Sequence, residues 1–83
     1  MIITERLEKF MEAYSAGLRK AIEDHPDDYP WTTTIPVETV LDRMRQAIRA
    51  GSFNHDGHGF KNACKILCIK HTRKSVINYI RGE

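Results

Sequence analysis

Apolar residues recur at steps of three and four along most of this chain, a spacing that places them on one face of an α-helix. The first stripe predicts a helix from about Glu5 to Asp24, with Thr4 as its N-terminal cap. His25-Pro26 should end this helix, because proline disfavours helical geometry in the residue before it. Its buried face is expected to carry Leu7, Phe10, Met11, Tyr14, Leu18, Ala21 and Ile22.

A second stripe predicts a helix over about Pro36 to Ala50. Proline suits the first helical position, and Gly51 suits the left-handed residue that often follows a helix. Between the two helices, residues 27–35 are predicted to be extended and irregular, with Tyr29 and Trp31 folded back onto the core. The buried stripe of the second helix is Val37, Val40, Leu41, Met44, Ala47 and Ile48.

The third stripe is interrupted, and this interruption is the most informative feature of the pattern. Phe60, Ala63, Cys64 and Leu67 indicate a helix over Gly59 to Ile69, after a loop over 51–58 that Phe53 anchors. Six polar residues follow, and the apolar series resumes only at position 76 with Val76, Ile77 and Ile80. We therefore predict a bend, with a second helix capped by the hydroxyl of Thr72. A helix, a short turn and a second helix form the outline of a helix-turn-helix.

Length and composition fit one small domain. The chain has 83 residues, of which 41% are hydrophobic and 29% are charged, as in ordinary globular proteins. We expect a single all-α domain over residues 1–83, made of two long helices and a C-terminal helical hairpin that resembles a helix-turn-helix. Neither a membrane helix nor a signal peptide is evident, so a cytoplasmic location is expected. Cys64 and Cys68 are expected to be free and buried on one face of the third helix.

The net charge of +2 conceals a strong segregation along the chain. Residues 1–28 hold seven acidic and four basic residues, a balance of −3, whereas residues 59–83 hold six basic residues and one acidic residue, a balance of +5. A basic end is typical of a surface that binds polyanions, and arginine, lysine and asparagine can also read bases in the major groove. The candidate nucleic-acid-binding residues are Lys61, Lys65, Lys70, Arg73, Lys74, Asn78 and Arg81. The alternative is that these bases solvate exposed helix faces and pair with the acidic first helix.

The same segment resembles part of a known protein family. The run from Phe60 to Thr72, followed by Ile77 and Tyr79-Ile80, resembles the C-terminal pattern of a family of small bacteriophage and prophage proteins of unassigned function. Tyr29-Pro30-Trp31 and Val40 to Met44 fit the same pattern. Similar proteins tend to carry glycine where this chain has Cys68. The resemblance implies a source in mobile-element DNA, and it implies no activity and no site residues.

Metal and enzyme sites are weaker interpretations. Cys64, Cys68 and His71 would share a helix face if the helix persisted that far, and His55 and His58 lie nearby, so a zinc site is an open alternative. Buried core cysteines are the simpler interpretation, and we expect no metal ligands and no cofactor. Asp24, Asp27 and Asp28 beside His25 lack the ligand spacing of a calcium loop and fit a solvated linker. Cys64 and His71 have no third catalytic partner, so the chain is not expected to be an enzyme.

Two functions of different classes remain. The favoured one is a non-enzymatic protein of phage type that binds DNA or regulates through the basic surface over 61–81. The alternative is an interaction adaptor that binds a phage or host protein, or that self-associates, through an apolar patch. No membrane partner is expected, and the pattern leaves the oligomeric state open.

Overall fold

The fold is all-α, as the apolar periodicity predicts. The computed structural model describes residues 2–55 and 57–83, and these residues contain no β-strand. Asp56 of the predicted loop lies outside the described residues. The helices are α1 (Thr4–Asp24), the 3-10 helices η1 (Pro26–Asp28) and η2 (Pro30–Thr33), α2 (Val37–Ala50), α3 (His58–Ile66) and α4 (Arg73–Arg81).

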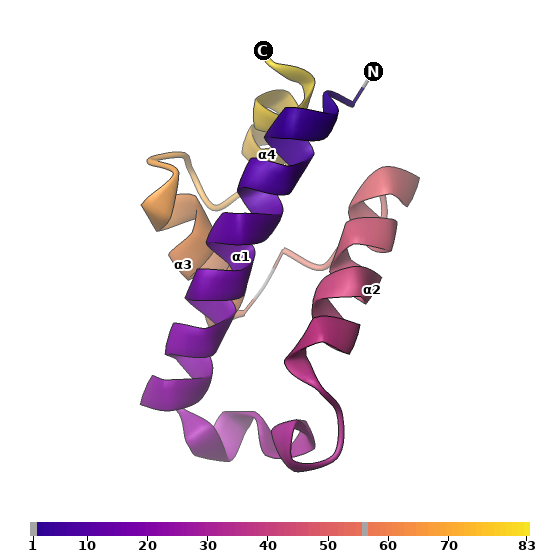
Figure 1. Cartoon of the computed structure of the whole chain (residues 1–83). Helices are drawn as coiled ribbons and strands as arrows, with labels where there is room; N and C mark the ends of the chain where they lie inside the picture. Colours follow the sequence, from indigo (N-terminus) through magenta and orange to yellow (C-terminus); the bar gives the residue numbers. More distant parts are fainter. Residues whose placement is uncertain (1, 56) are drawn as a thin grey trace.

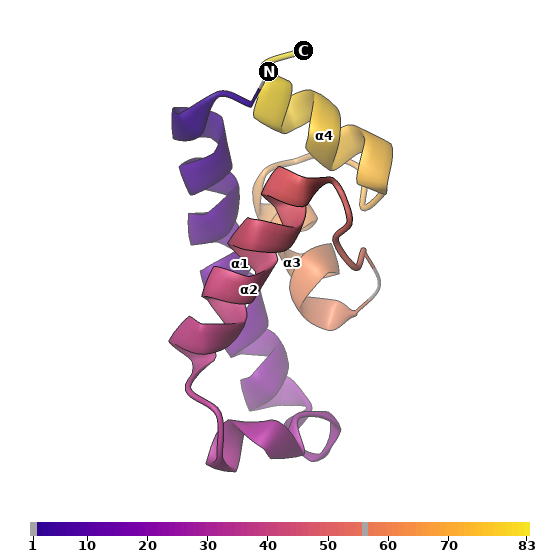
Figure 2. The same ribbon diagram turned by 90° about the vertical axis from the view of Figure 1, so that its right-hand side faces the viewer.

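The longest helix, α1, organises the molecule. It runs along the molecule in Figure 1, with α2 to its right and with α3 and α4 behind it. The view from the side in Figure 2 shows α4 lying across the end of the molecule, next to the C-terminal end of α2. The radius of gyration of 12.2 Å agrees with the value of about 12 Å expected for one domain of this length.

The most extensive helix contact is between α1 and α3. Small residues make this close approach possible. A Cβ atom placed on Gly17 would lie 2.8 Å from the Asn62 Cβ, 2.9 Å from the Ala63 nitrogen and 2.9 Å from the Gly59 oxygen. The amide of Asn62 also donates a 3.0 Å hydrogen bond to the Gly17 carbonyl. The two backbones therefore touch at a point where any side chain on Gly17 would separate them.

The core follows the predicted stripes, although the burial of some positions on α1 and α2 differs from the prediction. On α1, the predicted positions are buried except Tyr14 and Ile22, which are half-buried, and Ala13 and Gly17 are also buried. On α2, Met44 and Ile48 are buried and the rest of the predicted stripe is half-buried, since α2 makes far less contact with α1 than α3 does. Phe53 is buried and anchors the loop before α3, as predicted. The largest fully buried side chains are Phe10, Leu7, Ile80, Val76 and Cys64.

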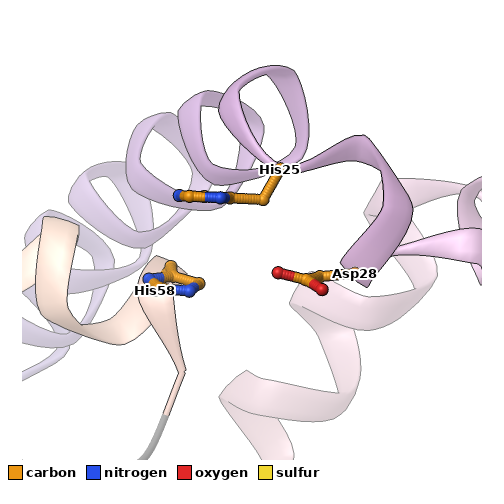
Figure 3. Close-up of side chains that lie close together, drawn as sticks. All are labelled: His25, Asp28 and His58. Atoms are coloured by element: carbon orange, nitrogen blue, oxygen red, sulfur yellow. The ribbon is translucent and has the colours of Figure 1, made fainter.

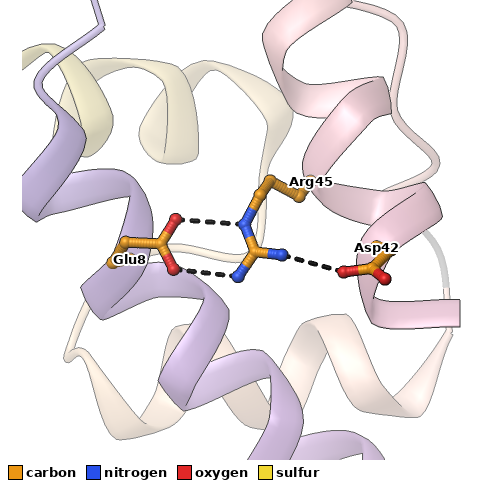
Figure 4. Close-up of polar contacts among 3 residues, drawn as sticks. All are labelled: Glu8, Asp42 and Arg45. Carbon is orange, nitrogen blue, oxygen red and sulfur yellow. Dashed lines mark hydrogen bonds and ion pairs between the residues drawn. The ribbon is translucent and has the colours of Figure 1, made fainter. Parts of the chain in front are cut away.

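Arg45 ties α2 to α1 through a charged cluster. Its guanidinium donates two hydrogen bonds to the Glu8 carboxylate, of 3.0 and 2.8 Å, and one of 3.0 Å to Asp42 (Figure 4). These hydrogen bonds hold the pKa of Glu8 below its ordinary value. Because the cluster is largely exposed, it orients α2 more than it stabilises the fold.

The linker between α1 and α2 is not extended, so that prediction is wrong. It forms η1 and η2. In η2 and directly after it, the hydroxyls of three successive threonines donate hydrogen bonds to carbonyls three residues back, which favours turns over a strand. Tyr29 and Trp31 are half-buried and pack edge to face against each other, with ring centroids 6.1 Å apart. Neither ring joins the main core.

Three helix ends differ from the predicted ones. Thr4 is the first residue of α1 and Ile3 is its N-cap, without a side-chain hydrogen bond, so the predicted Thr4 cap is wrong. Pro36 is the N-cap of α2 instead of its first residue. The third helix ends at Ile66, three residues earlier than predicted, whereas Gly51 has the predicted left-handed conformation with φ of 75°.

The beginning of the chain is attached to α4. The Ile3 amide donates a 3.1 Å hydrogen bond to the Ile80 carbonyl, and the Arg6 guanidinium lies 4.9 Å from the centre of the Tyr79 ring. Among the described residues, no helix combines the length and the apolar character needed to cross a membrane.

Candidate nucleic-acid interface

The turn after α3 has a defined backbone geometry. Cys68 has φ of 57°, and among the described residues it is the only non-glycine residue with positive φ. The Cys68 amide donates to the Lys65 carbonyl and the Ile69 amide donates to the Cys64 carbonyl, over 3.1 and 2.9 Å. This pair of bonds is a Schellman motif, which usually has glycine at the left-handed position. The chain therefore turns sharply at Cys68 even though it lacks the glycine.

The predicted break before α4 is confirmed. Thr72 is the N-cap of α4, and its hydroxyl oxygen accepts a 3.1 Å hydrogen bond from the Ser75 amide. The connection over 67–72 is longer than the three or four residues typical of a helix-turn-helix. The structure thus contains a capped helical hairpin whose turn is longer than that of a typical helix-turn-helix.

Four of the seven candidate residues border two adjacent grooves. Lys61 and Lys65 are exposed on α3 and border a groove of about 360 Å³ that reaches Ile69. Lys70 and Asn78 border a groove of about 280 Å³ that also includes Ile69. We call Lys61, Lys65, Lys70 and Asn78 the basic strip.

The other three candidate residues lie in different surroundings. Lys74 is exposed on α4, one helical turn before Asn78, so it can extend the basic strip. Arg73 lies over Phe53, with its guanidinium carbon 5.6 Å from the ring centre. Arg81 borders an apolar groove of about 260 Å³ near the end of α2, together with Arg49. The structure does not bring all seven residues to one face.

Four acidic residues of α1 and α2 are paired with bases of the same two helices. Lys20 pairs with Asp24 within α1, and Arg19 pairs with Glu38 of α2 across 3.2 Å. Arg45 forms ion pairs with both Glu8 and Asp42. Over residues 2–55 and 57–83, no ion pair includes a base from positions 61–81, so the pairing between the two ends that the sequence left open is not observed.

The cysteines do not form the zinc site considered above. Cys64 is 1% exposed in the core, and burial raises the pKa of its thiol to about 11. Cys68 is exposed and lies outside α3, so the expectation that it is buried on the same helix face is wrong. The helix ends before His71, and among the described residues these three side chains do not form a group at metal-ligand distance.

The structure instead gathers three potential ligands that the sequence pattern did not link. His25, Asp28 and His58 are exposed, and one ligand atom of each lies within 4.8 Å of the others (Figure 3). The sequence pattern does not connect the linker acids with the loop histidines, because 33 positions separate His25 from His58. The only signal in the sequence was a histidine at each of two expected helix ends.

No family model, no curated protein and no solved structure matches this chain. The resemblance to small bacteriophage proteins therefore stays a prediction that these comparisons do not support.

Proposed function

We propose that this protein binds nucleic acid, mainly through phosphate contacts made by the basic strip and Lys74. The observation that supports this proposal is the charge arrangement. Four carboxylates of α1 and α2 form ion pairs with Arg19, Lys20 and Arg45, while the bases of α3 and α4 are exposed to solvent and form no ion pair among the described residues. Exposed bases of this kind attract polyanions and release counterions when they contact phosphates.

Contacts with the backbone fit this surface better than extensive base reading. Lysine is a compact point charge suited to phosphate, whereas bidentate base contacts are made mostly by arginine, asparagine and glutamine. The two arginines of α4 lie beside Phe53 and beside the groove at the end of α2. Asn78 is the one residue of the basic strip suited to adenine, so weak sequence preference is part of the proposal.

The test is fluorescence anisotropy with labelled random duplex and single-stranded DNA at several salt concentrations. The logarithm of the association constant should fall linearly with the logarithm of salt, with a slope of about −0.9 per phosphate contact on duplex DNA. Lys65→Ala should reduce that slope by about one unit.

Lys9→Ala is the matched control, because it removes the same charge from an exposed position of α1. It should leave the slope almost unchanged. Absence of binding at low salt, binding that is insensitive to salt, or equal effects of the two variants would contradict the proposal.

A second candidate function is protein interaction. It is favoured by the apolar groove between the ends of α2 and α4, which Ile48, Ile77 and Ile80 border, and by Ile66, which is 55% exposed. Self-association that is lost in Ile77→Glu, combined with no binding to DNA, would support this adaptor function over the first proposal.

A further inference from the structure

We propose that His25, Asp28 and His58 form a zinc-binding site at the junction of α1, η1 and α3. His25 is the C-cap of α1, Asp28 is the last residue of η1 and His58 is the first residue of α3. Three elements from two distant parts of the chain therefore present one ligand each to the same small volume (Figure 3).

The spacing suits a small metal ion. Ligand atoms bound tetrahedrally to zinc at about 2.0–2.1 Å lie about 3.4 Å from one another. The three ligand atoms lie within 4.8 Å of one another. The two imidazole rings stack nearly parallel, at 16°, with centroids 4.4 Å apart, so at least one ring must turn before both rings can direct a nitrogen at the same ion. Both side chains are exposed, which leaves room for this rotation.

The type of ligand selects the metal. Imidazole nitrogen is a borderline ligand that favours zinc and neighbouring transition metals, whereas calcium and magnesium prefer sites made of oxygen alone. Two histidines and one carboxylate make three protein ligands, which leaves a fourth position for water or for an external ligand. The site would thus be an open one.

A tyrosine next to Asp28 lies between the linker and α3. Tyr29 is half-buried, and its hydroxyl oxygen lies near the backbone N–H groups of His58 and Gly59. Burial raises the pKa of that hydroxyl, the carboxylate of Asp28 adds to this effect, and the nearby backbone N–H groups oppose it. Since Tyr29 directly follows Asp28 and lies beside the first turn of α3, Asp28 is placed near His58 before a metal binds.

The experiment is calorimetric titration of the full-length, tag-free protein with zinc chloride, together with thermal melting. We expect one zinc ion per chain and an increase in Tm of about 10–20 °C at a free zinc concentration one hundred times Kd. His58→Gln and Asp28→Asn should each weaken binding at least about tenfold, since loss of a ligand costs at least as much as loss of its supporting partner. Both side chains are exposed, so the variants should fold normally.

His71→Gln and Cys68→Ser are the matched controls, because they remove an exposed histidine and the exposed thiol outside this cluster. Both should bind zinc like the original protein. Imidazole signals in nuclear magnetic resonance should shift on zinc addition for His25 and His58 and stay in place for His71. Absence of stoichiometric binding, or a loss of affinity in a control as large as that in His58→Gln, would overturn the proposal.

Discussion

Replacement of Gly17 by alanine tests the close contact between α1 and α3. In an isolated helix this change should stabilise by about 1 kcal/mol, because alanine has a much higher helix propensity than glycine. In the folded protein the new methyl group would meet Asn62, Ala63 and Gly59 at 2.8–2.9 Å, well inside ordinary van der Waals contact. Two of these three atoms belong to the backbone, so they cannot rotate away.

Overpacking of this kind costs typically about 1–3 kcal/mol, and separation of the helices would also weaken the bond from Asn62 to the Gly17 carbonyl. We therefore expect Gly17→Ala to lower the free energy of unfolding by about 1–2 kcal/mol despite the gain in propensity. For a domain of this size, Tm should fall by about 5–10 °C.

Urea denaturation followed by circular dichroism measures this change. Ala16→Gly is the control, since Ala16 is exposed on the same turn of α1 and should lose about 1 kcal/mol through helix propensity alone. Propensity by itself predicts opposite signs for the two variants, whereas the packing argument predicts destabilisation in both. A Gly17→Ala protein as stable as the original, or more stable, would refute the proposed contact.

Three further predictions concern the hairpin and the thiols. Thr72→Ala should destabilise the protein by about 0.5–2 kcal/mol, whereas Thr72→Ser should retain most of the stability, and an equal loss in both would contradict the cap. Cys68→Gly should raise the stability by about 1 kcal/mol in urea denaturation, because glycine adopts positive φ without a steric cost, and no gain would argue against the left-handed turn. A thiol reagent at pH 8 should modify Cys68 quickly and Cys64 only on unfolding, since Cys64 is buried with a pKa of about 11, and rapid modification of two thiols in the native protein would exclude this arrangement.

Much of the fold could be predicted because it depends on local patterns. The stripes of α1 and α3 and the cap at Thr72 are properties of neighbouring residues, and the structure confirms them. Thr4 is not the cap, because the helix begins at Thr4 itself, one residue earlier than the capping pattern implies. The turns over 30–34 could not be predicted as such, because threonine suits a strand by its shape and also stabilises a turn through its hydroxyl.

The features that could not be predicted depend on contacts between distant residues. Gly17 has no apolar side chain, so its burial follows only from the approach of α3, which the stripe of α1 does not specify. The arrangement of the candidate nucleic-acid interface was likewise only partly accessible, because the position of Arg73 depends on Phe53 of a separate loop. His25 and His58 meet for the same reason, through the packing of α1 on α3.

The preference of α1 for α3 has a consequence for how the protein folds. The main partner of α1 is not the next long helix along the chain, and the hydrogen bond between Asn62 and Gly17 joins residues 45 positions apart. The intervening chain must therefore close a long loop before the tightest contact in the molecule can form, which costs entropy early in folding and slows it relative to a bundle of sequential neighbours. A fragment that ends after α2 would lack the surface against which α1 packs, so the two halves of the chain should gain their structure together in one cooperative step.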